Sequence, residues 1–167
     1  MTRNKQPHPP ILLGGGGKGL LRLAAKHADY VNIIPPVGTL GKISVDSLRR
    51  MNDEAFRARV DYVRAEAKRL GRDSDAIKIS NLMLVFTLVD TEETARQTLG
   101  AVAQMFNVSP EVLAASPIAF IGTPKQCVVE LQRRAERWGV SQFIFGTFMG
   151  VDEKLISRLR EEVISKI

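Results

Sequence analysis

A run of four glycines followed by a lysine is the part of this sequence best suited to chemistry. It consists of Gly14, Gly15, Gly16, Gly17 and Lys18, directly after the apolar run 11–13. Glycines let the backbone come close to a bulky anion, and the free N–H groups of a helix start point toward it. Lys18 adds a mobile positive charge. Since a tight turn needs only one or two glycines, the run predicts a phosphate or pyrophosphate site.

Two familiar phosphate-binding loops fit this run less well. Gly14, Gly16 and Gly19 match the G-x-G-x-x-G spacing of dinucleotide-binding folds. Those folds also need an acid at the end of the second strand, where this sequence has Ile33-Ile34-Pro35-Pro36. The nucleotide-triphosphate loop needs Ser or Thr where Gly19 stands. A dinucleotide-binding domain is therefore the weaker alternative, and the triphosphate loop is weaker still.

Three further positions are candidates for contact with the same ligand. Asn32 is the one polar residue inside an apolar strand, and it either faces a ligand or satisfies a neighbouring backbone group. Thr123, in Gly122-Thr123-Pro124, either caps the following helix or also bonds a ligand at that helix end. Gly146 follows the apolar run 143–145 and permits close approach. In parallel barrels functional residues gather at the carboxyl ends of strands, where these loops lie.

No pattern in the sequence predicts catalytic residues or metal ligands. His27 falls in the last turn of an expected helix, where a positive charge suits the helix dipole. Cys127, the single cysteine, has no nearby histidine in sequence and excludes an internal disulfide. We expect structural roles for both residues, and neither a Ser-His-Asp set nor a carboxylate pair is present.

Composition excludes several classes of protein. The 167 residues carry a net charge of +6, but the basic side chains are mixed with acids along the helices, so we predict no nucleic-acid binding. No window approaches about 18 uninterrupted apolar residues, so no membrane association is predicted. The N-terminus does not resemble a signal peptide, which favours a cytoplasmic protein.

Strands and helices alternate along the chain. Apolar runs predict strands at 11–13, 30–34, 82–86 and 143–145, and their apolar character is typical of sheets covered on both faces. Helical spacing predicts helices at 20–28, 56–70, 95–106, 109–116, 124–138 and from Asp152 onward. Residues 120–121 form either a fifth strand or a lead-in to a helix. The order predicts an α/β fold with a parallel sheet, preceded by a loose arm at 1–8.

Three separated segments resemble the luciferase-like monooxygenases. The first runs from Pro10 to Asp29 and contains the glycine run and Ala24-Ala25-x-x-Ala28-Asp29. The second is Gly122-Thr123-Pro124, and the third is Arg134-x-x-x-Trp138-Gly139-Val140-Ser141. The resemblance covers residues 9–167 and is strongest to the branch associated with the deazaflavin coenzyme.

The resemblance implies a partial TIM (β/α)8 barrel, with residues 9–167 as the C-terminal half, about the last four strand–helix units. It implies a flavin- or deazaflavin-dependent oxidoreductase of monooxygenase type, with FMN or the deazaflavin coenzyme as cofactor and a small-molecule substrate. The glycine run and Lys18 would contact the cofactor phosphate. The family's other half usually contacts the flavin ring and the substrate, so catalysis by this chain alone is not implied.

Barrel closure predicts a partner. Four parallel strands cannot close an eight-stranded barrel, and they leave open edges and an uncovered face. We therefore expect either a homo-oligomer of halves or pairing with a separate N-terminal half. The alternative is a non-catalytic module that binds a phosphate ligand or serves as a scaffold without turnover.

Overall fold

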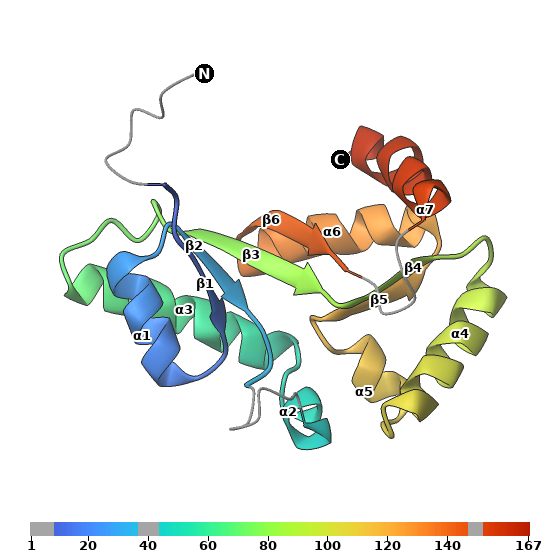
Figure 1. Cartoon of the computed structure of the whole chain (residues 1–167), viewed down its shortest axis with the longest axis horizontal. Coiled ribbons are helices and arrows are strands. Elements are labelled where there is room, and N and C mark those ends of the chain that lie inside the picture. Colours follow the sequence, from blue (N-terminus) through green and yellow to red (C-terminus); the bar gives the residue numbers. More distant parts are fainter. Residues whose placement is uncertain (1–8, 37–43, 147–151) are drawn as a thin grey trace.

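The computed structural model describes residues 9–36, 44–146 and 152–167. The predicted arm at 1–8 and the loop at 37–42 lie outside these ranges. Two sheets and seven α-helices make up the described part of the chain (Figure 1).

The larger sheet has four parallel strands. They are β1 (Leu12–Gly15), β2 (Tyr30–Ile33), β3 (Lys78–Met83) and β6 (Val140–Phe145), adjacent in that order. All four predicted strands overlap observed ones, and the parallel arrangement is confirmed. β1 and β6 are the two edges of this sheet.

A second sheet arises from a break in one long apolar run. The strand predicted at 82–86 is divided at Leu84 into β3 and β4 (Val85–Leu88). β4 pairs in parallel with β5 (Ala119–Gly122). Of the two alternatives for residues 120–121, the structure therefore confirms the additional strand and not the lead-in to a helix. The run therefore serves two sheets in succession, which its apolar pattern alone did not indicate.

Most helices begin and end where sequence signals predict. They are α1 (Lys18–His27), α2 (Val45–Arg49), α3 (Asp53–Arg69), α4 (Glu92–Met105), α5 (Pro110–Ala114), α6 (Pro124–Trp138) and α7 (Glu153–Arg158), the last extended by η1 (Leu159–Val163) and η2 (Ile164–Lys166). α2 was not predicted. Gly71 and Gly139, with φ of 72° and 68°, follow α3 and α6 as the expected stops. Two residues expected to face inward are exposed: Leu70 at 39% and Ile156 at 54%.

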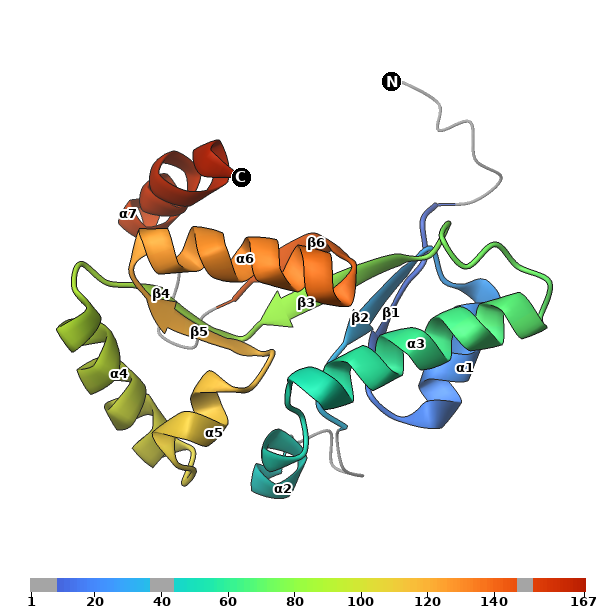
Figure 2. The same ribbon diagram turned by 180° about the vertical axis from the view of Figure 1, so that it is seen from behind.

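Helices pack on one face of the larger sheet. Side chains alternate along a strand, and Leu13, Val31, Ile33, Ile79 and Phe143 join the core formed with α1, α3 and Trp138. Figure 2 shows α3 and α6 in front of the strands. The sequence predicted cover on both faces, whereas the helices in the described ranges pack on one.

The other face, called the open face below, has no such helix layer among the described elements. By alternation and register it carries Leu12, Gly14, Tyr30, Asn32, Lys78, Ser80, Leu82, Gln142 and Ile144. Leu12, Lys78 and Gln142 are exposed, while Asn32 and Ser80 are buried.

A buried arginine links the two sheets. Arg134 of α6, 2% exposed, donates to Asn81 Oδ1 at 2.7 Å, to the Pro117 carbonyl at 2.8 Å and to the Ala119 carbonyl at 2.9 Å. Its charge is balanced by Glu130 at 2.7 Å. Arg134 therefore ties the end of β3 to the start of β5 beside the break at Leu84.

The single cysteine is buried in the core between α6 and the strands. Cys127 packs in a cluster with Met83, Phe86 and Leu131. Burial raises the pKa of its thiol to about 12. The expectation of an inert thiol agrees with this environment. Within the described residues, no helix is long and apolar enough to cross a bilayer, and no cluster of metal-binding side chains occurs.

Candidate functional site

The glycine run joins the end of β1 to the start of α1. β1 ends at Gly15, and Gly17 is the N-cap of α1 with an extended backbone (φ −85°, ψ 144°). No side chain caps this helix end, and its first turn contains no acid. The first N–H groups of a helix have no intrahelical partner, so this end can accept an anion.

This uncapped end distinguishes α1 from the other helices. Of the seven α-helices in residues 9–36, 44–146 and 152–167, each of the six others begins with a side-chain cap: Ser44, Asn52, Thr91, Ser109, Thr123 and Asp152. The capping residue in those helices satisfies one of the N–H groups that α1 leaves available.

Packing explains only part of the glycine run. A Cβ on Gly16 would lie 2.1 Å from the Ile34 carbonyl oxygen, which is backbone and cannot move aside. A Cβ on Gly17 or Gly19 would meet nothing within 4 Å. The turn therefore requires glycine at Gly16, whereas the space beside Gly17 and Gly19 is free for a ligand to approach the backbone.

Lys18 and Arg59 bring two cations to the run. Lys18 is the first residue of α1 and is exposed. Arg59, on α3, donates from Nε to the Gly16 carbonyl at 3.0 Å and from Nη1 to the Ala55 carbonyl at 2.7 Å. Burial lowers the pKa of Arg59. An arginine remains protonated in proteins, so its charge persists here.

Arg59 also orients the peptide group after Gly16. In a trans peptide the C=O and N–H bonds point in opposite directions. Because Arg59 holds the Gly16 carbonyl, the N–H of Gly17 points away from that guanidinium. The sequence reading missed Arg59, since 43 residues separate it from Gly16 and no local pattern marks it.

Asn32 lies beside the glycine run but already has a backbone partner. It pairs with Gly14 in the β1–β2 register, on the open face. Its Oδ1 accepts from the Leu82 N–H at 3.1 Å, just beyond the last β2–β3 pair. Its structural role is therefore clear, and its nitrogen lies on the side of Gly14, 3.8 Å from the position of a Cβ there.

Thr123 and Gly146 lie away from the run. Thr123 follows β5 in the smaller sheet, and its hydroxyl accepts from the Gln126 N–H at 3.3 Å in a capping box. Gly146 follows the opposite edge strand, β6, and donates to the Met83 carbonyl at 2.8 Å. The glycine run, Thr123 and Gly146 therefore do not follow strands of a single sheet. Thr147 lies outside the described residues. Only Asn32 adjoins Gly14–Lys18.

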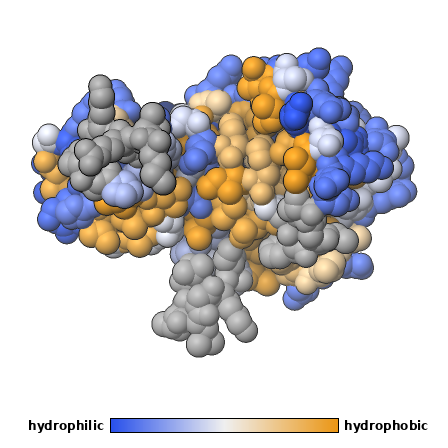
Figure 3. All heavy atoms as spheres, turned by 45° about the horizontal axis from the view of Figure 1, so that its top comes forward, coloured by the Kyte–Doolittle hydropathy of each residue, from blue (hydrophilic) through white to orange (hydrophobic). Residues whose placement is uncertain are grey.

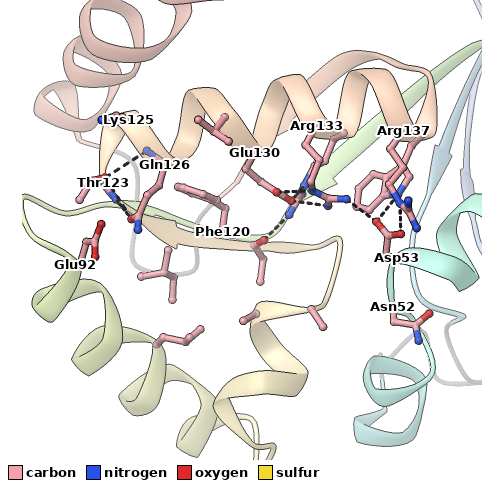
Figure 4. A pocket seen from close by; sticks show the side chains of 18 of the residues that line it. Asn52, Asp53, Glu92, Phe120, Thr123, Lys125, Gln126, Glu130, Arg133 and Arg137 are labelled. Atoms are coloured by element: carbon pink, nitrogen blue, oxygen red, sulfur yellow. Dashed lines mark hydrogen bonds and ion pairs between the residues drawn. The ribbon is translucent and has the colours of Figure 1, made fainter.

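A cleft of about 1030 Å³ lies elsewhere, between α6, β5 and the helices α4 and α5 (Figure 4). Its charged side chains are largely paired with one another. Asp53 accepts from Arg133 at 2.6 Å and also bonds Arg137, while Glu130 binds Arg133 at 2.7 Å. These charges neutralise one another, and the glycine run is absent from the lining, so the cleft is separate from the run.

Similarity to known proteins is found at the level of structure. No protein-family model and no curated protein matches the sequence. The long-chain alkane monooxygenase LadA matches with 20% identity and a TM-score of 0.66, over 95% of this chain and 40% of that chain. The coenzyme F420-dependent tetrahydromethanopterin reductase from Methanopyrus kandleri matches with 19% identity and a TM-score of 0.65, over 94% of this chain and 50% of that chain.

A riboflavin lyase, RcaE, solved with modified FMN and riboflavin, matches with 14% identity and a TM-score of 0.66, over 99% of this chain and 44% of that one. The fold is that of about half of a luciferase-like barrel. The sequence-based prediction of a partial luciferase-like barrel is thereby confirmed. At these identities the luciferase-like likeness is one of fold, and this chain spans half or less of the structures named.

Proposed function

We propose that this chain is the phosphate-binding half of a flavin- or deazaflavin-dependent oxidoreductase of the luciferase-like fold. The observation that carries the proposal is the uncapped start of α1 beside free space at Gly17 and two nearby cations. The likeness to structures whose names include FMN or F420 supports a cofactor of this class. Hydride chemistry would belong to that cofactor.

The residues of the run fit a phosphate group. The N–H groups of Gly17, Lys18 and Gly19 would donate to phosphate oxygens, as helix starts do in other phosphate sites. Lys18 would add a charge-assisted bond. Arg59 would act indirectly, by holding the Gly16 carbonyl away from the anion. Asn32 would add its amide nitrogen from the open face, while Thr123 and Gly146 remain weaker candidates because of their distance from the run.

The proposal includes a second half of the barrel. Four strands would supply the C-terminal half, and the flavin ring and small-molecule substrate would be held mainly by four more strands. Those strands would come either from a second copy of this chain or from a separate N-terminal half. A chain that binds the cofactor without turnover would correspond to the alternative of a non-catalytic module.

The test is a cofactor titration of the purified chain, followed by fluorescence, with FMN and with the deazaflavin coenzyme. We expect Lys18→Ala to weaken binding by about 1–3 kcal/mol, which is roughly 5- to 150-fold in Kd. Lys26→Ala is the matched control, because Lys26 is also exposed but lies in the last turn of the same helix. Equal affinities for wild type, Lys18→Ala and Lys26→Ala would place the cofactor elsewhere.

A further inference from the structure

Helix α1 carries the excess of positive charge in the described part of the chain. The sequence has 24 Lys and Arg side chains and 18 Asp and Glu side chains. Three of the cations, Lys18, Arg22 and Lys26, belong to α1, which contains no acid, and three others lie outside the described residues. The described residues outside α1 therefore hold 18 cations and 18 acids, and their charges balance.

The three cations form one row along α1, called the cation row below. They are four residues apart, so they lie on one face of the helix, separated by about 6 Å along its axis. All three side chains are exposed, and the row begins at Lys18, directly after the glycine run. Exposed apolar atoms do not distinguish α1, since apolar surface crosses the middle of the molecule in Figure 3. Charge does.

The cation row has little to neutralise it. Arg22 Nε lies 3.8 Å from Glu66 of the neighbouring helix α3 (Figure 1), but the same Glu66 oxygen also pairs with Arg69 at 2.9 Å. Within the described ranges, which contain every Asp and Glu of the sequence, Lys18 and Lys26 have no acid within 4 Å. One shared carboxylate therefore serves three cations of α1.

Other helices neutralise their cations locally. In α3, α4 and α6 an ion pair joins residues three or four apart, as between Arg57 and Asp61. In α1 the same spacing joins like charges, which repel each other. Lys18, in the first turn, also opposes the helix dipole. Local arrangements that cost stability in this way are expected at binding sites, so folding does not account for the cation row.

The dimensions of the cation row fit an extended anionic chain. A single phosphate at the glycine run would engage Lys18 but would leave Lys26, about 12 Å further along the axis, without a partner. In an extended chain alternate residues are about 7 Å apart, which is close to the spacing of the cation row. The guanidinium of Arg22 suits carboxylates and phosphates alike.

We infer that the ligand of the glycine run is a phosphate compound with an extended tail of further negative groups, and that the cation row binds this tail. The inference rests on the proposed function and deepens it. It distinguishes such a cofactor from FMN, a mononucleotide whose negative charge is confined to one phosphate.

Two pairs of small probes test this chemistry. One pair is phosphoserine followed by four glutamates and phosphoserine followed by four glutamines, both acetylated and amidated. The other pair is tripolyphosphate and orthophosphate. Binding is followed by the NMR shifts of the α1 amides in about 20 mM salt. We expect the glutamate peptide, tripolyphosphate or both to bind at least about fivefold more tightly than the partner probe, and about 0.5 M salt to remove the difference.

Variants of the cation row locate the effect. Arg22→Ala and Lys26→Ala should each reduce the advantage of the charged tail about two- to fivefold. Binding of the glutamine peptide and of FMN should stay unchanged in Lys26→Ala, because neither has a charge that reaches that position. Lys68→Ala is the matched control, since Lys68 is also an exposed lysine in the last turn of a helix but lies on α3, outside the cation row.

Equal binding within both pairs of probes would overturn the inference, and so would equal losses in Lys26→Ala and Lys68→Ala. The proposed function would survive either result if the glutamine peptide or FMN still bound and lost affinity in Lys18→Ala. Failure of all the probes and of FMN to bind would overturn both proposals.

Discussion

Gly16, inside the glycine run, and Gly19, just after Lys18, have different steric surroundings, and this separates a folding requirement from a binding one. Gly16 is pressed against the Ile34 carbonyl, whereas Gly19 lies in the first turn of α1 with nothing near it. We expect Gly16→Ala to destabilise the chain by about 1–3 kcal/mol through overpacking. Gly19→Ala should stabilise it by about 0.5–1 kcal/mol, since alanine favours a helix. Urea unfolding measures both, and equal effects would contradict the steric assignment.

Gly17 provides the corresponding test of binding. Its backbone is in a region that alanine adopts, and a methyl group there would meet no protein atom within 4 Å. We expect Gly17→Ala to change the free energy of unfolding by less than about 1 kcal/mol. The methyl group would nevertheless occupy space proposed for the phosphate, so cofactor affinity should fall at least tenfold. Unchanged affinity in the titration would argue against close approach at Gly17.

At the residue level, local signals were predictable and distant ones were not. The caps at Thr91, Thr123 and Asp152 follow from short patterns and are all observed. The glycine run was found by the same means. Arg59 was missed because its bond to Gly16 depends on how α3 packs beside β1, and neither helical spacing nor charge identifies that contact.

At the scale of the elements, α6 joins separate parts of the chain. Its Arg134 donates to three oxygens near the break between β3 and β4. We expect Arg134→Met to destabilise the chain by about 3–5 kcal/mol, because it leaves those oxygens and Glu130 without their buried partner. Arg133→Met, which alters a more exposed neighbour, should cost less. Similar losses in denaturant unfolding for the two variants would contradict this role.

The contact between α3 and α6 makes stability depend on pH. Burial raises the pKa of Asp53, but hydrogen bonds from Arg133, Arg137 and Trp138 outweigh burial, and the pKa lies below its ordinary value. A carboxyl with a lowered pKa adds stability above its unfolded pKa, near 4, and loses it as pH falls through the folded value.

We therefore expect the free energy of unfolding to be nearly constant from pH 7 to 5 and to fall below about pH 4. Asp53→Asn should be less stable at pH 7 and should show a shallower fall toward pH 3, because it has no carboxyl to protonate. Burial raises the pKa of Glu130, but hydrogen bonds from Arg133 and Arg134 outweigh burial, so this pKa also lies below its ordinary value. Glu130 therefore contributes in the same direction and remains in the variant. Parallel pH profiles for wild type and Asp53→Asn would contradict this expectation.

Element types were predictable where the apolar spacing was unambiguous. Helices at 56–70 and 124–138 and the strands at 30–34 and 143–145 follow from periodicity and stop signals. The break at Leu84 was not predictable, because 77–89 is one long β-rich run and the division depends on Arg134 and β5, which come later in the chain. The five-residue helix α2 is too short for a periodic signal.

For the whole molecule, the two edges of the larger sheet should be its least protected strands. β1 and β6 each pair with one neighbour in the described structure, whereas β2 and β3 pair on both sides. We expect amides of β1 and β6 to exchange with deuterium faster than those of β2 and β3 in the isolated chain. A bound second half should slow exchange at both edges together. Uniform protection across the sheet would show that the edges are already covered.

The partial-barrel fold was predicted from the order of the motifs and not from periodicity. Strand and helix spacing gives a parallel α/β sheet, which fits both open sheets and barrels. The separated motifs at Pro10–Asp29, Gly122–Pro124 and Arg134–Ser141 indicated a half-barrel, and the structural matches confirm that fold. The charge on the open face became evident only from the strand register that brings Tyr30 and Lys78 together.

The single thiol of the chain, on Cys127, is buried and stays protonated far above physiological pH. We therefore expect it not to react with maleimides. A cysteine introduced at any exposed position would be the sole point of attachment for a fluorophore or spin label. Dyes placed one at a time along each rim of the larger sheet could therefore report, by energy transfer, when and in which orientation a complementary half arrives.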